Sequence, residues 1–382
     1  MFTLTFAVVA AGLVVDSSVR AEGRAGTALG GQSSGSGAFS ANIDARASGP
    51  DVSFRLELAP SALVAAGNQL FAAGIAEGAL RLDPDSSLRV RQRFGYGIID
   101  LSPLAGSTSR TPPADTAPVQ QPPSSRFVSI QESFSSLDLD LAVSRRLKLH
   151  GSAGWNVSGG ADAPSRAEIP LSRGPQLRTS AEWAATRLDS LRAELAAIDY
   201  RYSNGRRASV ATVTGGWKKV LSPDTELMVV AGPGVGRAQA DGQRAAVVLY
   251  GVAAADCRVK MTRDILAGMG VSVEPLGDPL TGEVVERGSL RASATWGLRG
   301  VGTVSATLAG SVAVTSGSQA AGSAQAGDRF LQAELGASFP VAPRSTLGVG
   351  VRGAGFSRPP PGQPAAQWAA FIALGTQFPQ LR

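Results

Sequence analysis

The chain has 382 residues, a formal net charge of +6 and a sequence pI of about 10.0. Only 17% of the residues are charged, below the ~25% of a soluble domain. Glycine accounts for 46 residues, so the composition suits strands and turns better than helices. The basic residues are mostly scattered arginines without a basic run, which argues against a nucleic-acid-binding protein.

The N-terminus has the pattern of a secretory signal peptide. An apolar run extends from Leu4 to Val15, and Val19-Arg20-Ala21 offers a small-residue cleavage site. We therefore predict a signal peptide over residues 1–21 and a mature domain over 22–382. The first three residues lack the usual basic charge, so an ordinary first strand or buried segment stays an alternative here. No other stretch has 18 uninterrupted apolar residues, so a membrane protein of this sequence would cross as a closed barrel.

The N-terminal third carries weaker signals. We expect a first strand near residues 24–34, with turns at Ser48-Gly49-Pro50-Asp51 and Asp83-Pro84-Asp85-Ser86 between later strands. Residues 102–126 are rich in proline, serine and threonine, and they are predicted to form a mobile outer loop. The other strands expected in this third lie near 39–47, 52–59, 70–82 and 87–99.

From residue 127 onward, apolar and polar residues alternate strictly. Each alternating segment has about ten residues, which is enough to cross a bilayer as a tilted strand. One face carries leucine, valine and alanine, whereas the other carries small residues and scattered charges. That division predicts lipid outside and water inside, with a soluble β-sandwich as the alternative. The clearest segments are 147–158, 289–298, 303–314 and 331–339.

The connections between these segments alternate in length. Membrane barrels join their strands by short periplasmic turns and longer outer loops in alternation. We therefore predict an all-β fold, a transmembrane antiparallel up-and-down barrel of about 18 strands, with about 16 as the alternative count. Short turns are expected near 341–345, 299–302, 261–263 and 221–225, and longer loops near 357–366, 316–328, 275–283 and 237–244.

Aromatic residues mark the expected membrane interfaces. Trp368 and Phe378 lie ten residues apart on one face of the last strand, and Trp155 and Trp296 are predicted to join them in two girdles. The last strand resembles the C-terminal strand of outer-membrane proteins, whose final aromatic the barrel assembly machinery reads. Here residues 379–382 follow that aromatic. The resemblance implies a bacterial outer-membrane location, in contact with membrane lipid and lipopolysaccharide.

Several basic residues fall on the predicted inward face. Arginine rings favour anions or acidic glycans, so these residues are a candidate anion path. The alternative is that they pair with lumen carboxylates such as Asp44 and Glu57. The candidate lumen residues are Arg81, Arg89, Arg91, Arg93, Arg178, Arg291, Arg352, Lys148 and His150.

Residues that carry catalysis are scarce. His150 is the one histidine and has no partner at an identifiable spacing, and Cys257 is the one cysteine. We therefore expect no disulfide, no metal site, no cofactor and no enzymatic activity. The glycine-rich stretch 232–236 lacks the lysine and following helix of a phosphate loop.

Two further segments carry a more specific resemblance. Phe94-Gly95-Tyr96-Gly97 with Asp100-Leu101-Ser102-Pro103, and the stretch 278–287, resemble the Wzp-type barrel partners of myxobacterial polysaccharide export. The resemblance implies a barrel that completes the outer-membrane pore for a periplasmic polysaccharide-export protein related to the Wza type.

The expected function is the passage or export of hydrophilic molecules, including exopolysaccharide, through an aqueous lumen. A structural or adhesive barrel, whose loops bind partners without transport, is the alternative. Neither the transported molecule nor the oligomeric state follows from the sequence.

Overall fold

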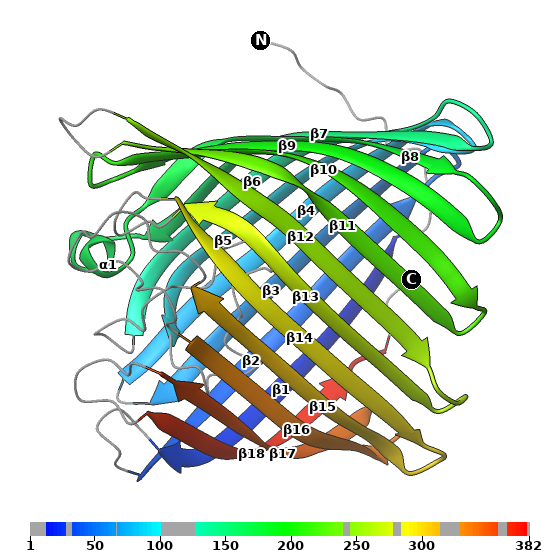
Figure 1. The fold of residues 1–382 in the computed structure, drawn as a ribbon. Coiled ribbons are helices and arrows are strands. Elements are labelled where there is room, and N and C mark those ends of the chain that lie inside the picture. Colours follow the sequence, from blue (N-terminus) through cyan, green and yellow to red (C-terminus); the bar gives the residue numbers. More distant parts are fainter. Residues whose placement is uncertain are drawn as a thin grey trace.

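The protein forms one closed cylinder of strands (Figure 1). The computed structural model describes residues 13–27, 33–65, 67–100, 127–239, 245–277, 284–313, 329–357 and 365–379. The predicted loop 102–126 and most of the predicted apolar leader, residues 1–12, lie outside the described residues. No helix in the described ranges is long and apolar enough to cross a membrane.

Eighteen strands and one short helix make up the described chain. In order they are β1 Val14–Thr27, β2 Ser33–Ser48, β3 Val52–Ala65, β4 Gly67–Asp83, β5 Ser86–Asp100, β6 Phe127–Ala142, β7 Leu147–Gly160, α1 Ala163–Glu168, β8 Ser172–Ala184, β9 Asp189–Tyr202, β10 Arg207–Ser222, β11 Thr225–Gln239, β12 Ala246–Lys260, β13 Ile265–Gly277, β14 Val284–Leu298, β15 Gly302–Ala313, β16 Arg329–Ala342, β17 Ser345–Phe356 and β18 Ala366–Gln377.

The strands follow one another as an antiparallel meander. Each strand pairs with its neighbours in sequence, and β1 closes the sheet by pairing with β18 as well as β2. Eight short turns lie at one end, on the right of Figure 1, and the remaining connections, including the four-residue turn 203–206, leave the strands at the opposite end. The predicted barrel, its count of 18 and the four predicted short turns are confirmed, whereas the predicted longer loops lie mostly outside the described residues.

The first strand differs from its prediction. It runs over Val14–Thr27 rather than 24–34, because residues 18–26 are held from both sides by β18 and β2. A mature chain that begins at Glu22 would retain only residues 22–27 of β1, and the boundary of the signal peptide stays a prediction. The next strands are also longer than expected, since β3 and β4 pair as far as Ala65 and Gly67.

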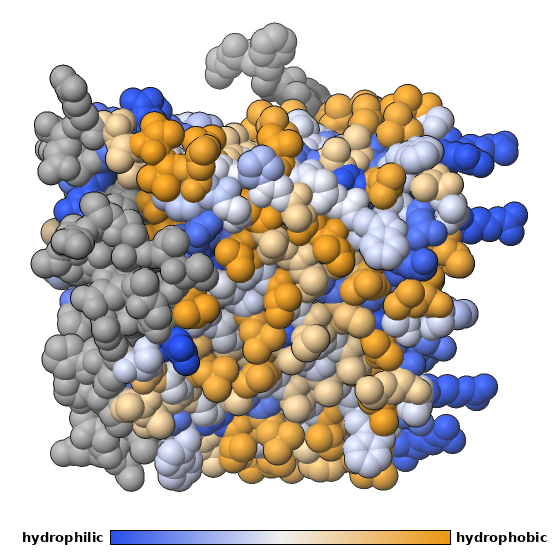
Figure 2. Space-filling model, viewed as in Figure 1, coloured by the Kyte–Doolittle hydropathy of each residue, from blue (hydrophilic) through white to orange (hydrophobic). Residues whose placement is uncertain are grey.

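The outer face of the wall is apolar. In β18, Trp368, Ile372 and Leu374 are exposed while Ala369, Phe371 and Ala373 between them are buried. Figure 2 shows apolar residues across the middle of the wall and hydrophilic residues at the turn end. An apolar outer face of this kind is the one that lipid covers in a membrane barrel.

The predicted girdle residues Trp155, Trp296, Trp368 and Phe378 are all exposed. Trp368 begins β18 at the loop end, whereas Trp296 and Phe378 lie at the turn end, where Trp183 and Trp217 join them. These last two tryptophans were not among the predicted girdle residues. Their role at membrane interfaces stays a prediction.

Candidate pore lumen

The predicted lumen residues lie on the inward face of the wall. Arg89, Arg91 and Arg93 share one face of β5, opposite to the face of exposed Val90 and Phe94. The strand registers place the other residues on the same side. These are Arg81 in β4, Lys148 and His150 in β7, Arg178 in β8, Arg291 in β14 and Arg352 in β17.

Two arginines of β5 share one carboxylate. Glu77 of β4 lies 3.4 Å from Arg89 Nε and 3.0 Å from Arg91 Nε. All three side chains remain partly exposed, with Arg91 at 33%. Asp138 of β6 stands opposite Arg89 from the other side, so carboxylates flank the candidate anion path on both neighbouring strands.

A second charged cluster lies beside it on β2 and β3. Asp44 accepts hydrogen bonds from Arg46 and Arg55, and Arg55 also lies 2.8 Å from Glu57. A pocket of about 700 Å³ adjoins Asp44 and Arg46 at the turn end of the lumen, and Arg344 lines its other side. These residues give the wall strongly hydrated groups of both signs.

Arg352 does not line open lumen, contrary to the prediction. Its side chain is only 1% exposed because Glu22 of β1 and Glu334 of β16 each lie 2.7 Å away. The guanidinium also stacks 3.9 Å from the centre of the Phe371 ring, and Arg24 approaches Glu22 to 2.7 Å. This network of ion pairs stabilises the barrel where its first and last strands pair.

Two of the remaining predicted residues, His150 and Arg178, have partners that spacing did not reveal. His150 Nδ1 lies 2.7 Å from Asp140 of β6, and Arg178 Nε donates to Glu194 of β9 at 2.7 Å. Lys148 faces Glu182 across β7 and β8. Arg291 stands between Gly270 and Ala309. In the described ranges, no group of three or more histidine, cysteine, aspartate or glutamate residues could hold a metal ion.

The loop end of the lumen is narrowed by the β7–β8 connection, which contains α1. Ile169 packs on an inward apolar cluster that includes Phe71, Val128 and Ile130. Ser165 is buried and accepts a hydrogen bond from the Ser129 backbone. Hydrogen bonds from Ser165 hold the pKa of the capping residue Asp162 below its usual range.

The β13–β14 hairpin narrows the same end from another side. β12 and β13 pair only over residues 253–260 and 266–273. Beyond that point the described end of the β13–β14 hairpin, residues 274–277 and 284–287, is here called the hairpin tip. The hairpin leaves β12 there and contacts β10 and β11. Val284 and Val285 in this tip are almost fully buried. The Tyr250 hydroxyl of β12 donates to the Val284 carbonyl at 2.6 Å.

Close packing and one carboxylate hold the tip in this position. A Cβ at Gly277 would lie 2.6 Å from the Tyr202 hydroxyl, so any other residue there would have to displace this side chain. Glu286 accepts a hydrogen bond from the Gly251 N–H at 2.9 Å, on the edge of β12 that β13 has left. The tip is therefore a docked constriction of the lumen.

A closed antiparallel barrel with an apolar outer face and an ionic inner face is the architecture of outer-membrane transport barrels. The apoprotein of the FrpB iron transporter from Neisseria meningitidis is similar, with a TM-score of 0.52 and 8% identity over 95% of this chain and 81% of that one. OpdK of Pseudomonas aeruginosa with vanillate gives a TM-score of 0.51 and 11% identity over 97% and 99% of the two chains. The copper transporter OprC gives 0.50 and 13% over 94% of this chain, which spans 64% of OprC. These likenesses show the fold.

The model of the EpsX exopolysaccharide export family matches residues 77–380. The chain belongs to this family. It is a pore-forming barrel for the passage or export of hydrophilic molecules, so the resemblance to polysaccharide-export barrels is confirmed at the level of the family. No match was found among curated proteins.

Proposed function

We propose that this protein is the outer-membrane conduit through which an exopolysaccharide leaves the cell. The observation that carries the proposal is the inner wall, which presents ionic and hydroxyl side chains within a closed barrel of a polysaccharide-export family. A ring of eighteen strands encloses an aqueous channel, and hydroxyl-rich polymers bind groups of this kind.

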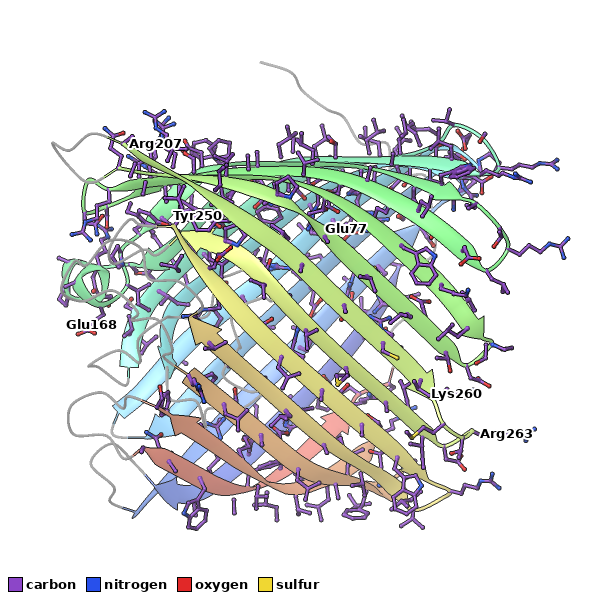
Figure 3. All side chains as sticks on the ribbon, viewed as in Figure 1. Glu77, Glu168, Arg207, Tyr250, Lys260 and Arg263 are labelled. Atoms are coloured by element: carbon purple, nitrogen blue, oxygen red, sulfur yellow. The ribbon has the colours of Figure 1, made fainter. Side chains whose placement is uncertain are left out.

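The turn end supports a periplasmic partner. Arg145, Arg187, Arg263 and Arg299 are exposed in four of the short turns, and Figure 3 shows Arg263 projecting from this end beside Lys260. We propose that a periplasmic polysaccharide-export protein with an acidic rim docks here. Such charges steer association and weaken with salt. Lipopolysaccharide and the barrel assembly machinery complete the proposed partners.

The test is conduction by the purified barrel in a planar bilayer. We expect stable ohmic channels whose current is reduced by oligogalacturonate, an acidic glycan, more than by neutral maltodextrin of equal length. A folded barrel that carries no current would overturn the proposal and favour the structural or adhesive alternative.

We also propose that the barrel acts without catalysis, so that His150 serves only as a lumen residue held by Asp140. His150→Gln should leave both the current and the block by oligogalacturonate unchanged. Loss of a hydrolytic activity on polysaccharide in this variant would contradict that proposal.

A further inference from the structure

A row of arginines lies on the outer face of the wall near its loop end. Arg173 of β8 stands directly opposite Arg201 of β9, and Arg201 stands opposite Arg207 of β10. The outward direction follows from alternation, because Leu195 and Val213, two exposed apolar residues, share this face. Figure 3 shows Arg207 at the surface of this corner of the barrel.

The row carries more positive charge than its surroundings neutralise. Asp199 is the one carboxylate on this face in the loop-end half of β8 to β11, as far as these strands are described. It pairs in bidentate fashion with Arg207 at 2.8 and 2.9 Å and lies 3.7 Å from Arg201. Arg237 of β11 adds a further charge opposite Ser209, which itself donates to Asp199.

Like charges directly opposite each other destabilise a sheet. Asp199 offsets only part of the repulsion among three arginines in register, so an external anion would stabilise the row further. Arginine binds phosphate through paired hydrogen bonds, and strands hold these four side chains in a fixed arrangement.

The depth of the row matches the level of lipid headgroups. The outward face of β9 is apolar from Leu191 at the turn end through Ala197, and Asp199 is the first charged residue after this stretch. At about 3.4 Å per residue and a tilt near 40°, this stretch rises roughly 20 Å, close to the ~25 Å apolar band of membrane barrels. The arginines thus begin where the apolar band ends.

We infer that Arg173, Arg201, Arg207 and Arg237 form a binding site for the phosphate groups of a phosphorylated glycolipid in the outer leaflet. Asp199 orients the Arg207 guanidinium through two hydrogen bonds and lies within ion-pair distance of Arg201. The inference uses the membrane location of the barrel but is independent of what crosses its lumen.

The test compares two triple variants in detergent. R173Q/R201Q/R237Q removes the excess charge but keeps the pair between Arg207 and Asp199, so that this carboxylate retains its partner. The control R145Q/R187Q/R263Q removes the same charge from the turn end. Bisphosphorylated lipid A is the probe, dephosphorylated lipid A is the second ligand, and binding is measured by native mass spectrometry and by the midpoint of thermal unfolding.

We expect bisphosphorylated lipid A to bind and stabilise the wild type and the control, and to bind the row variant at least about tenfold more weakly. Dephosphorylated lipid A should leave all three midpoints unchanged. Equal stabilisation by both lipids, or unchanged binding to the row variant, would overturn the inference. The single-channel current of the row variant should equal that of the wild type, so a failed conduction test stays distinguishable from a failed lipid site.

Discussion

Single residues decide which side of the wall meets lipid. Leu308 lies opposite Ala292 and Ala333 on the outer face, whereas Thr307 lies opposite Ser293 and Glu334 on the lumen face. We predict that Leu308→Arg lowers the free energy of unfolding in lipid vesicles by about 2–4 kcal/mol. Thr307→Arg should have far less effect, because its new charge meets water and Glu334. Equal losses in urea titrations would show that the faces are assigned wrongly.

Arg352 provides a second prediction at this scale. Removing one partner from a buried ion pair leaves an uncompensated charge, at a cost of about 3–5 kcal/mol. Arg352→Met should therefore destabilise the barrel by somewhat less than this, because the fully buried Glu22 loses Arg352 but keeps Arg24 at 2.7 Å. Arg91→Met is the matched control, since Arg91 and Glu77 are both partly exposed. Unfolding midpoints in vesicles compare the two, and a smaller loss for Arg352→Met would contradict the assigned role.

The ion-pair partners of Arg352 and His150 could not be predicted from the sequence. Alternation was sufficient to put Arg352 on the inner face, and the structure agrees. Its main partner, Glu22, is 330 residues away, and the two meet only because the barrel closes. His150 and Asp140 are ten residues apart on adjacent strands, a spacing that depends on where the hairpin turns. Residue patterns therefore predicted the face of each charge but not its neighbour.

Strands with large apolar residues on one face were predicted well. β14, β15 and β16 match their expected segments because leucine, valine and tryptophan alternate there with polar residues. β1 was misplaced because Val19 is the one large apolar residue on its outward face between Ser17 and Ala25, so its alternation signal is weak. Its pairing with β18 and β2 sets its position instead. α1 was not predicted, although Asp162 before Pro164 is a helix-start signal.

The hairpin tip of β13 and β14 yields a prediction at the level of elements. Tyr250 packs on Val284 and donates to its carbonyl, so Tyr250→Ala removes both the packing and the hydrogen bond. Truncating a buried aromatic costs about 3–5 kcal/mol. We expect the tip to undock and the single-channel conductance to rise. Tyr250→Phe loses only a hydrogen bond worth about 1 kcal/mol and should conduct like the wild type. Unchanged conductance in Tyr250→Ala would show that the tip does not limit the current.

At the scale of the whole molecule, the architecture followed from a few regularities. An even number of strands and alternating connection lengths are both requirements of a closed antiparallel barrel, so the count of 18 could be predicted. The electrostatics of the lumen could not, because they depend on carboxylates from neighbouring strands. Glu77, Asp138 and Asp140 face the same lumen as the arginines of β5. The inner wall thus carries charges of both signs on neighbouring strands.

The last prediction concerns ion selectivity. Arg89, Arg91 and Arg93 stand on one inward face of β5, with Glu77 between the first two. Replacing all three by glutamine removes three positive charges and leaves Glu77 without these partners, so the local field reverses. We expect the reversal potential in a KCl gradient to shift toward cation selectivity relative to the wild type.

The barrel itself should remain folded in this variant, because Arg89 and Arg91 are partly exposed and glutamine can still be hydrated at their positions. R145Q/R187Q/R263Q is again the control, since it removes equal charge from the turns outside the lumen. A variant that fails to fold in vesicles would make these arginines structural partners of Glu77 and its neighbours. A folded variant with unchanged selectivity would move the selective region to another part of the lumen, with the constriction beneath Tyr250 as the next segment to alter.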